Sequence, residues 1–270
     1  MSKVNLNVML VASAIAGAAF IYSCTKEDIN SSSSPDLYTP ANSSGYTPCP
    51  NVANAENPYD QAGVTHNEGL EYIYNHRAEW ACGGSGTLAP NIAQVAANFW
   101  CDNGYGQGTD CYNTTFTQFS DFLDGFDYSD PDEIINDMGS TALQDYMHQL
   151  IDEVNDYTDS TQIDTLLESI KQIESLVITS SLSAGEKEAF LGSASIARYS
   201  ACYWFQEYRK TQSDWTHCPT GGGGIPAGKI NWKNVAKIVG ADILGFAATI
   251  EVGGVGGAIV GSGYVAACIL

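Results

Sequence analysis

Basic residues are scarce in this sequence. Eleven lysines and arginines stand against 31 aspartates and glutamates among 270 residues, so the formal net charge is −20. Because the phosphate backbone of a nucleic acid is itself strongly negative, we expect no nucleic-acid partner for a chain this acidic. A charge of this size instead favours solubility outside the cell, since like charges keep molecules apart.

Motifs that hold metals or cofactors are also missing. The chain has no CxxC or HxxxH spacing, which zinc sites commonly use. The acidic stretches at 102–110 and 121–133 offer oxygen ligands for calcium, but neither follows the EF-hand order. The glycine run at 221–224 lacks the Gly-Lys-Ser/Thr ending of a phosphate-binding loop. We therefore expect no metal and no other cofactor.

No set of residues predicts catalysis. Ser85 lies between glycines but lacks the spacing and the preceding strand of a nucleophile elbow. His66, His76 and Glu68 are the nearest approach to an acid/base set. For these histidines we expect hydrogen bonds to polar neighbours inside a helical bundle instead. An extracellular hydrolase is accordingly the least favoured function class.

The first 23 residues have the features of a secretory signal that is removed on export. Lys3 forms a short basic region, and residues 8–21 form an uncharged, mostly apolar run that is short for a membrane span. The run ends in Ile21-Tyr22-Ser23-Cys24, which resembles the lipobox cut by lipoprotein signal peptidase. The resemblance implies cleavage of residues 1–23 and a membrane anchor through lipid on Cys24.

A second resemblance follows the lipobox directly. Lys26, Glu27 and Asp28 form a basic-acidic cluster similar to the surface-export signal of lipoproteins in Bacteroidetes. It implies a protein anchored by lipid in the outer membrane and facing the cell exterior. Residues 24–57 are otherwise rich in Ser, Asn, Pro and Thr, which predicts a flexible lipidated tether.

The cysteine count fits an exported chain with disulfides. Besides Cys24 and Cys268, which lies in an apolar C-terminal stretch, six cysteines remain, and six can pair in fifteen ways. Only one pair is favoured by local sequence, because the turn-forming residues between Cys101 and Cys111 let the chain fold back. The six candidates are Cys49, Cys82, Cys101, Cys111, Cys202 and Cys218.

Residues 58–218 show the apolar periodicity of helices and few strand patterns. Asn57-Pro58 and Asp130-Pro131 are typical helix starts, with proline at the first helical position. The periodic run after Pro131 is interrupted at Gly139-Ser140, and Ser183-x-x-Glu186 matches a capping box. We predict an all-α fold, a disulfide-stapled helical bundle of about five helices.

The C-terminal part differs in composition. A Gly-rich linker is predicted at 219–228, followed by a tail at 229–270. Lysines and small residues each recur every fourth position in this tail, the small residues in a glycine-zipper pattern that predicts a helical hairpin with closely packed backbones. Two hypotheses stand equal: the tail inserts in membranes or self-associates, or it packs on the helical domain. The residues concerned are Lys229, Lys233, Lys237, Gly245, Gly253, Gly257 and Gly261.

Three short motifs carry a family resemblance. They are Asn57-Pro58-Tyr59-Asp60, His66-Asn67-Glu68, and Ile196-Ala197-Arg198-Tyr199-Ser200 with Trp204. Together with the Gly-rich tail they resemble uncharacterised surface lipoproteins of Bacteroidetes. The resemblance implies a helical domain followed by a tail, and it implies no activity or catalytic residue.

The predicted function is a cell-surface lipoprotein with a binding or structural role. Its expected partners are the membrane, through lipid on Cys24 and through 229–270 if the tail inserts, a second copy of itself if the tail self-associates, and a protein or glycan ligand that the sequence does not identify. The alternative is a bacteriocin-like membrane-active protein, because the basic, Trp-containing entry and glycine-rich apolar segment resemble glycine-zipper bacteriocins.

Overall fold

The computed structural model describes residues 49–81, 88–106, 110–125, 130–157, 163–210, 215, 231–250 and 254–269. Within these ranges the chain is all-α, as predicted, with ten helices and no strand. The helices are α2 (Gln61–Asn75), α3 (Arg77–Trp80), α4 (Leu88–Asp102), α5 (Cys111–Gly125), α6 (Pro131–Ile135), α7 (Thr141–Asp156), α8 (Ile163–Thr179), α9 (Ala184–Arg209), α10 (Trp232–Thr249) and α11 (Gly254–Ile269).

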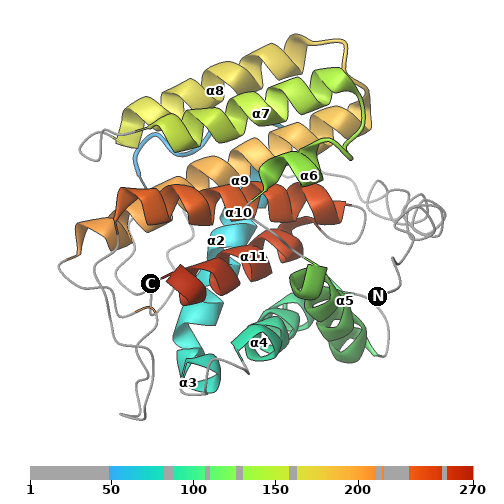
Figure 1. Ribbon diagram of the computed structural model, residues 1–270, viewed down its shortest axis with the longest axis vertical. Coiled ribbons are helices and arrows are strands. Elements are labelled where there is room, and N and C mark those ends of the chain that lie inside the picture. Colours follow the sequence, from blue (N-terminus) through green and yellow to red (C-terminus); the bar gives the residue numbers. More distant parts are fainter. Residues whose placement is uncertain are drawn as a thin grey trace, which may run out of the picture.

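The helices are stacked in layers, which Figure 1 shows from top to bottom. The pair α7 and α8 lies at one end, and α9 and α10 run side by side across the middle. Below them α11 packs against α10, α2, α4 and α5, so the last helix of the chain occupies the centre of the fold. This position explains its composition, because a helix that is apolar all round has no face for solvent.

Local signals fixed several helix ends. Ser183 and Glu186 form the predicted capping box at the start of α9, with the Ser183 side chain accepting from Glu186 N and Glu186 accepting from Ser183 N. Glu186 also accepts from the backbone N–H of Ser140, the residue that caps α7. Hydrogen bonds from Ser140 and Ser183 lower the pKa of Glu186 to about 2. The Glu186 carboxylate therefore links the starts of α7 and α9.

The bundle has more helices than the five expected. The break predicted at Gly139-Ser140 is real, and it separates the short α6 from α7. Helix α5 forms at 111–125 although the segment has several Thr and Asp residues, which have poor intrinsic helix propensity. Packing of Phe119 and Leu123 into the core stabilises α5 despite this composition.

The predicted tether extends too far into the domain. Residues 49–57 were assigned to it, yet Cys49, Val52 and Asn57 are buried. Asn57 does not cap a helix that starts at Pro58. Its side chain instead accepts from Tyr59 N, and α2 begins three residues after Pro58, at Gln61. The polar composition of this segment led to a wrong boundary for the tether, because its polar residue Asn57 is buried and forms hydrogen bonds with the domain.

The C-terminal hairpin packs inside the domain rather than standing apart from it. A Cβ atom on Gly245 would lie 2.7 Å from Gly257 O, and one on Gly257 would lie 2.5 Å from Gly245 O. The small-residue pattern thus brings the backbones of α10 and α11 into direct contact within one chain. Gly261 is buried on α11, while Lys233 and Lys237 lie exposed on α10. None of the helices in the described ranges combines the length and apolar character that a membrane span requires.

Candidate functional site

Two disulfides lie in the described part of the chain. Cys101 and Cys111 are joined across the α4–α5 connection, which confirms the one pair favoured by the sequence. Cys49 is bonded to Cys202, 153 positions away in α9, with a Cα–Cα distance of 5.9 Å. The second bond attaches the start of the folded domain to its longest helix. Cys82 and Cys218 lie outside the described residues.

Arg198 is the centre of a buried ion network just beyond Cys49. Its side chain is completely buried in α9, and its Nη2 lies 3.0 Å from Glu174 Oε1 on α8. The same guanidinium donates to Asp60 Oδ1 and to the carbonyl of Val52. Since a buried charge is costly without compensation, each partner of Arg198 is part of what makes its burial tolerable.

Glu174 is equally well satisfied. Its Oε1 accepts from Asn57 Nδ2 at 2.7 Å, and its Oε2 accepts from Asn54 Nδ2 at 2.6 Å. Asn57 Nδ2 also donates to Leu191 O at 2.9 Å. We call residues 49–60, with Cys202, Glu174 and Arg198, the N-terminal clamp. It holds the segment that leads into α2 against α8 and α9 by one covalent bond and a saturated polar network.

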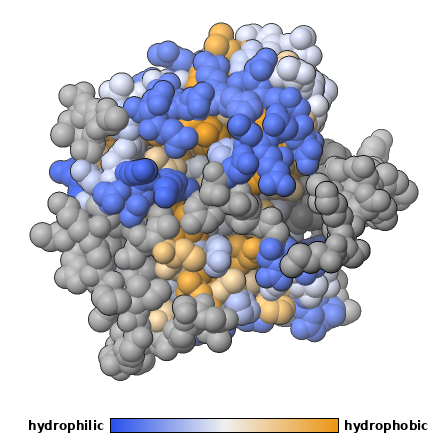
Figure 2. All heavy atoms as spheres, in the orientation of Figure 1, coloured by the Kyte–Doolittle hydropathy of each residue, from blue (hydrophilic) through white to orange (hydrophobic). Residues whose placement is uncertain are grey.

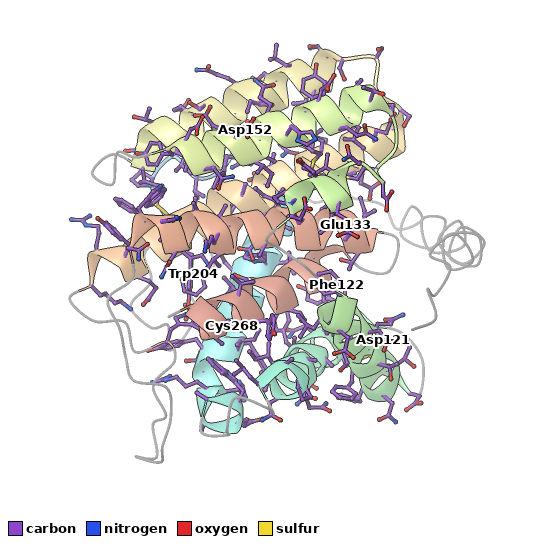
Figure 3. All side chains as sticks on the ribbon, viewed as in Figure 1. Asp121, Phe122, Glu133, Asp152, Trp204 and Cys268 are labelled. Atoms are coloured by element: carbon purple, nitrogen blue, oxygen red, sulfur yellow. A yellow bond between two sulfur atoms is a disulfide. The ribbon has the colours of Figure 1, made fainter. Side chains whose placement is uncertain are left out.

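A second polar cluster lies between the hairpin and the rest of the fold. Asp242 of α10 and His66 of α2 are both fully buried, and His66 Nε2 lies 3.5 Å from Asp242 Oδ2. Ser200 of α9 donates to the same oxygen. About one turn further along α9, Trp204 Nε1 donates to Ser262 Oγ of α11 at 3.2 Å. Figure 3 labels Trp204 in this region.

This second cluster, the hairpin cluster, is less well satisfied than the clamp. Asp242 Oδ1 and His66 Nε2 have no hydrogen-bond partner among the described residues, while His66 Nδ1 lies 3.1 Å from Asn67 Oδ1. Burial raises the pKa of Asp242 above its usual 3.8, and the nearby His66 and Ser200 partly oppose that rise. His66, Asp242 and Ser200 are each fully buried, so a substrate does not reach them in this conformation. Their geometry joins three helices.

The three motifs that carry the family resemblance meet at these two clusters. Asp60 pairs with Arg198, and Tyr199 OH donates to Asp60 Oδ2 at 3.1 Å. Asn67 Nδ2 donates to Tyr199 O at 3.0 Å, and His66 faces Asp242 beside Ser200. Motifs from the domain start, α2 and α9 therefore form one continuous polar interface, which gives a structural reason for their residue types.

Sequence analysis missed Glu174 and gave Arg198 no role. Glu174 lies next to Ile173 on the buried side of α8, and no nearby residue in the sequence marks it as buried. Arg198 did carry a signal, because it is the only charged residue in a run of small, apolar and aromatic residues from 189 to 205. A cation in such a helix requires a buried anion nearby.

Several predicted site residues fall outside the described ranges: Cys24, Lys26, Glu27, Asp28, Cys82, Cys218, Lys229 and Gly253. Within those ranges no group of three or more His, Cys, Asp or Glu residues is placed to hold a metal ion. His66 and His76 both bond to polar neighbours inside the bundle, as expected, with His76 Nδ1 lying 2.8 Å from Tyr72 O. No family model, curated protein or solved structure matches this chain.

Proposed function

We propose that the protein is a lipid-anchored cell-surface protein with a binding or structural role. The observation that carries this proposal is the placement of the Cys49–Cys202 disulfide. Cys49 follows the proposed lipid-bearing Cys24 by 49 − 24 = 25 residues, and it is bonded to Cys202 in the last third of the longest described helix. The anchor is thus separated from a covalent attachment in the core by one short segment.

This arrangement suits a protein held by its N-terminus. Any pull on the segment that follows Cys24 reaches Cys202 through a disulfide, before it reaches the hydrogen bonds of Asn54, Asn57 and Arg198. A covalent bond does not rupture under loads that open hydrogen bonds. The domain therefore stays folded while its first residues are attached to a membrane.

Labelled palmitate incorporation tests the anchor. We expect label on the wild-type chain and none on Cys24→Ala, with protease added to intact cells removing the wild-type domain. Cys268→Ala, which changes the exposed free cysteine, is the matched control and should keep its label. An unlabelled wild-type chain released into the medium would overturn the proposal.

The membrane-active alternative is supported by α11, which carries no charged residue. It requires the hairpin to leave the domain, separating Asp242 from Ser200 and Ser262 from Trp204. Because those contacts must break, the packed hairpin is the simpler role. Dye release from lipid vesicles by the full chain decides between them: sustained release supports the alternative, and retention of dye supports the packed hairpin.

A further inference from the structure

The connection after α4 and the start of α5 present aromatic side chains to solvent. Only three large hydrophobic residues in the described ranges are exposed, and two of them are Tyr105 (41%) and Tyr112 (48%). We propose that this face docks a basic polypeptide segment bearing arginine or lysine. We call Tyr72, Asp102, Tyr105 and Tyr112 the tyrosine surface. The inference extends the binding role proposed above, but it rests on different residues.

Hydrogen bonds and ring contacts link the members of the tyrosine surface. Tyr112 OH donates to Asp102 Oδ1 at 2.8 Å, and Tyr72 OH lies 3.5 Å from Asp102 Oδ2. The Tyr72 ring packs on Phe99, with ring centroids 5.6 Å apart, and Phe99 packs on Tyr105 at 5.9 Å. One carboxylate and three tyrosines therefore share a single face built from α2, α4 and α5.

The surface is held in place before any partner arrives. The Cys101–Cys111 disulfide closes the connection that contains Tyr105. Gly104 adopts a φ of +75°, which an L side chain rarely tolerates, and it turns the chain so that Tyr105 packs on Trp100 with centroids 4.9 Å apart. Such preorganisation lowers the entropy lost on binding, because the rings do not have to be ordered by the partner.

The charge around the tyrosine surface selects the partner. Residues 78–125, which include α4 and α5, contain five acidic residues and no lysine or arginine. Burial is the main cause that raises the pKa of Tyr72, and the negative charges of Asp102 and Glu79 raise it further. Both carboxylates therefore lie close to this ring. Arg77, just before this stretch, stacks on Tyr74 with its guanidinium carbon 4.2 Å from the ring centroid. A positively charged partner is therefore attracted and an anionic one repelled.

Aromatic rings and a carboxylate together suit a guanidinium or ammonium group. The ring face attracts a cation through its quadrupole, and the carboxylate supplies the opposite charge. A neutral oligosaccharide also stacks on tyrosine, but it gains nothing from the surrounding negative potential. Charge complementarity therefore favours the basic polypeptide.

Titration of the full chain with a fluorescent nona-arginine peptide at physiological salt tests the proposal. We expect the double variant Tyr105→Ala/Tyr112→Ala to weaken binding about tenfold, because each lost cation–π contact contributes about 0.5–1 kcal/mol at an exposed site. Leu176→Ala is the matched control, since Leu176 is the remaining exposed large hydrophobic residue (54%) and lies on α8. It should leave the affinity unchanged.

A second pair of variants separates the surface from general charge attraction. Asp102→Asn and Asp152→Asn each remove one negative charge, and Figure 3 shows Asp152 on α7, at the opposite end of the molecule from α5. We expect the first to weaken binding and the second to have little effect. Equal losses, or tyrosine variants that bind like wild type, would mean unspecific attraction and overturn the proposal.

Maltohexaose serves as the neutral probe. If it binds through the tyrosines while the peptide does not, the basic partner is wrong and the face recognises sugars. Because these titrations use purified chain in solution, their failure leaves the lipid anchor untouched, and an unlabelled Cys24 leaves the tyrosine surface untouched.

Discussion

The N-terminal clamp and the hairpin cluster bury ionisable side chains by different means. In the clamp, Arg198 and Glu174 have all their principal partners, and a disulfide lies beside them. In the hairpin cluster, His66 and Asp242 stand 3.5 Å apart and each leaves one polar atom without a partner among the described residues. The clamp is thus held by directional bonds, whereas the hairpin is held mainly by close packing of apolar and small residues.

The surface of the molecule is also uneven in hydropathy. Figure 2 shows that the face over α7 and α8 is largely hydrophilic, while a hydrophobic area appears lower on the same side. The clamp lies against α8 and the hairpin runs beneath α9. Substitutions in the clamp and in the hairpin therefore test different contacts that stabilise the fold.

Removing the clamp disulfide should have the largest effect. In the chain-entropy model, removing a disulfide that closes a loop of 153 residues lowers the free energy of unfolding by about 5 kcal/mol. Removing one that closes a loop of ten residues lowers it by about 3 kcal/mol. We expect Cys49→Ala/Cys202→Ala to lose more than Cys101→Ala/Cys111→Ala in urea unfolding. Equal losses would show that the clamp holds the segment without its covalent bond.

Arg198→Ala comes next. It leaves Glu174 buried without a cation, which typically costs about 3–5 kcal/mol of stability. Lys171→Ala is the control, because Lys171 pairs with the largely exposed Glu168, and such surface pairs contribute about 0–1 kcal/mol. Thermal unfolding of both variants checks the difference, and comparable midpoints would contradict a central role for Arg198.

Gly257→Ala tests the packed hairpin. The added Cβ would lie 2.5 Å from Gly245 O, so the helices must separate, at a cost of about 1–3 kcal/mol. Gly240→Ala on α10 is the matched control, since a Cβ there meets nothing within 4 Å. Alanine in that half-buried helical position, where the added Cβ has open space, should stabilise by about 0.5–1 kcal/mol. A destabilised Gly257→Ala beside a stabilised Gly240→Ala would confirm close backbone packing; two changes of the same sign would not.

Asp242→Asn should have the smallest effect and one that depends on pH. Burial raises the pKa of Asp242 above 3.8. Over a pH window above 3.8 the Asp242 carboxyl therefore keeps its proton in the native state, whereas in the unfolded chain it has lost it. The contribution to stability is therefore present in acid and is lost as pH rises through the native pKa. Unfolding measured from pH 4 to pH 7 should show a flatter profile for Asp242→Asn than for wild type. Parallel profiles would contradict the raised pKa.

Local features of the fold could be predicted well. The capping box of Ser183 and Glu186 spans three residues, and the Cys101–Cys111 bond spans ten, so their chemistry is visible within a short window. Helix α5 could not be predicted in this way, because its polar residues disfavour a helix until Phe119 and Leu123 are buried. The predicted end of the tether was wrong for the same reason: Asn57 is a residue type common in linkers, yet tertiary contacts bury it.

The sequence by itself determined an acidic all-α chain with helices of apolar periodicity, one turn-closed disulfide and a glycine-rich final segment. Only the tertiary structure decided that Cys49 pairs with Cys202, that Arg198 meets Glu174, and that α11 lies at the centre of the domain. The physical reason is distance along the chain. Helix propensity and turn chemistry act between neighbours, whereas these contacts join segments whose approach depends on how all the helices pack together.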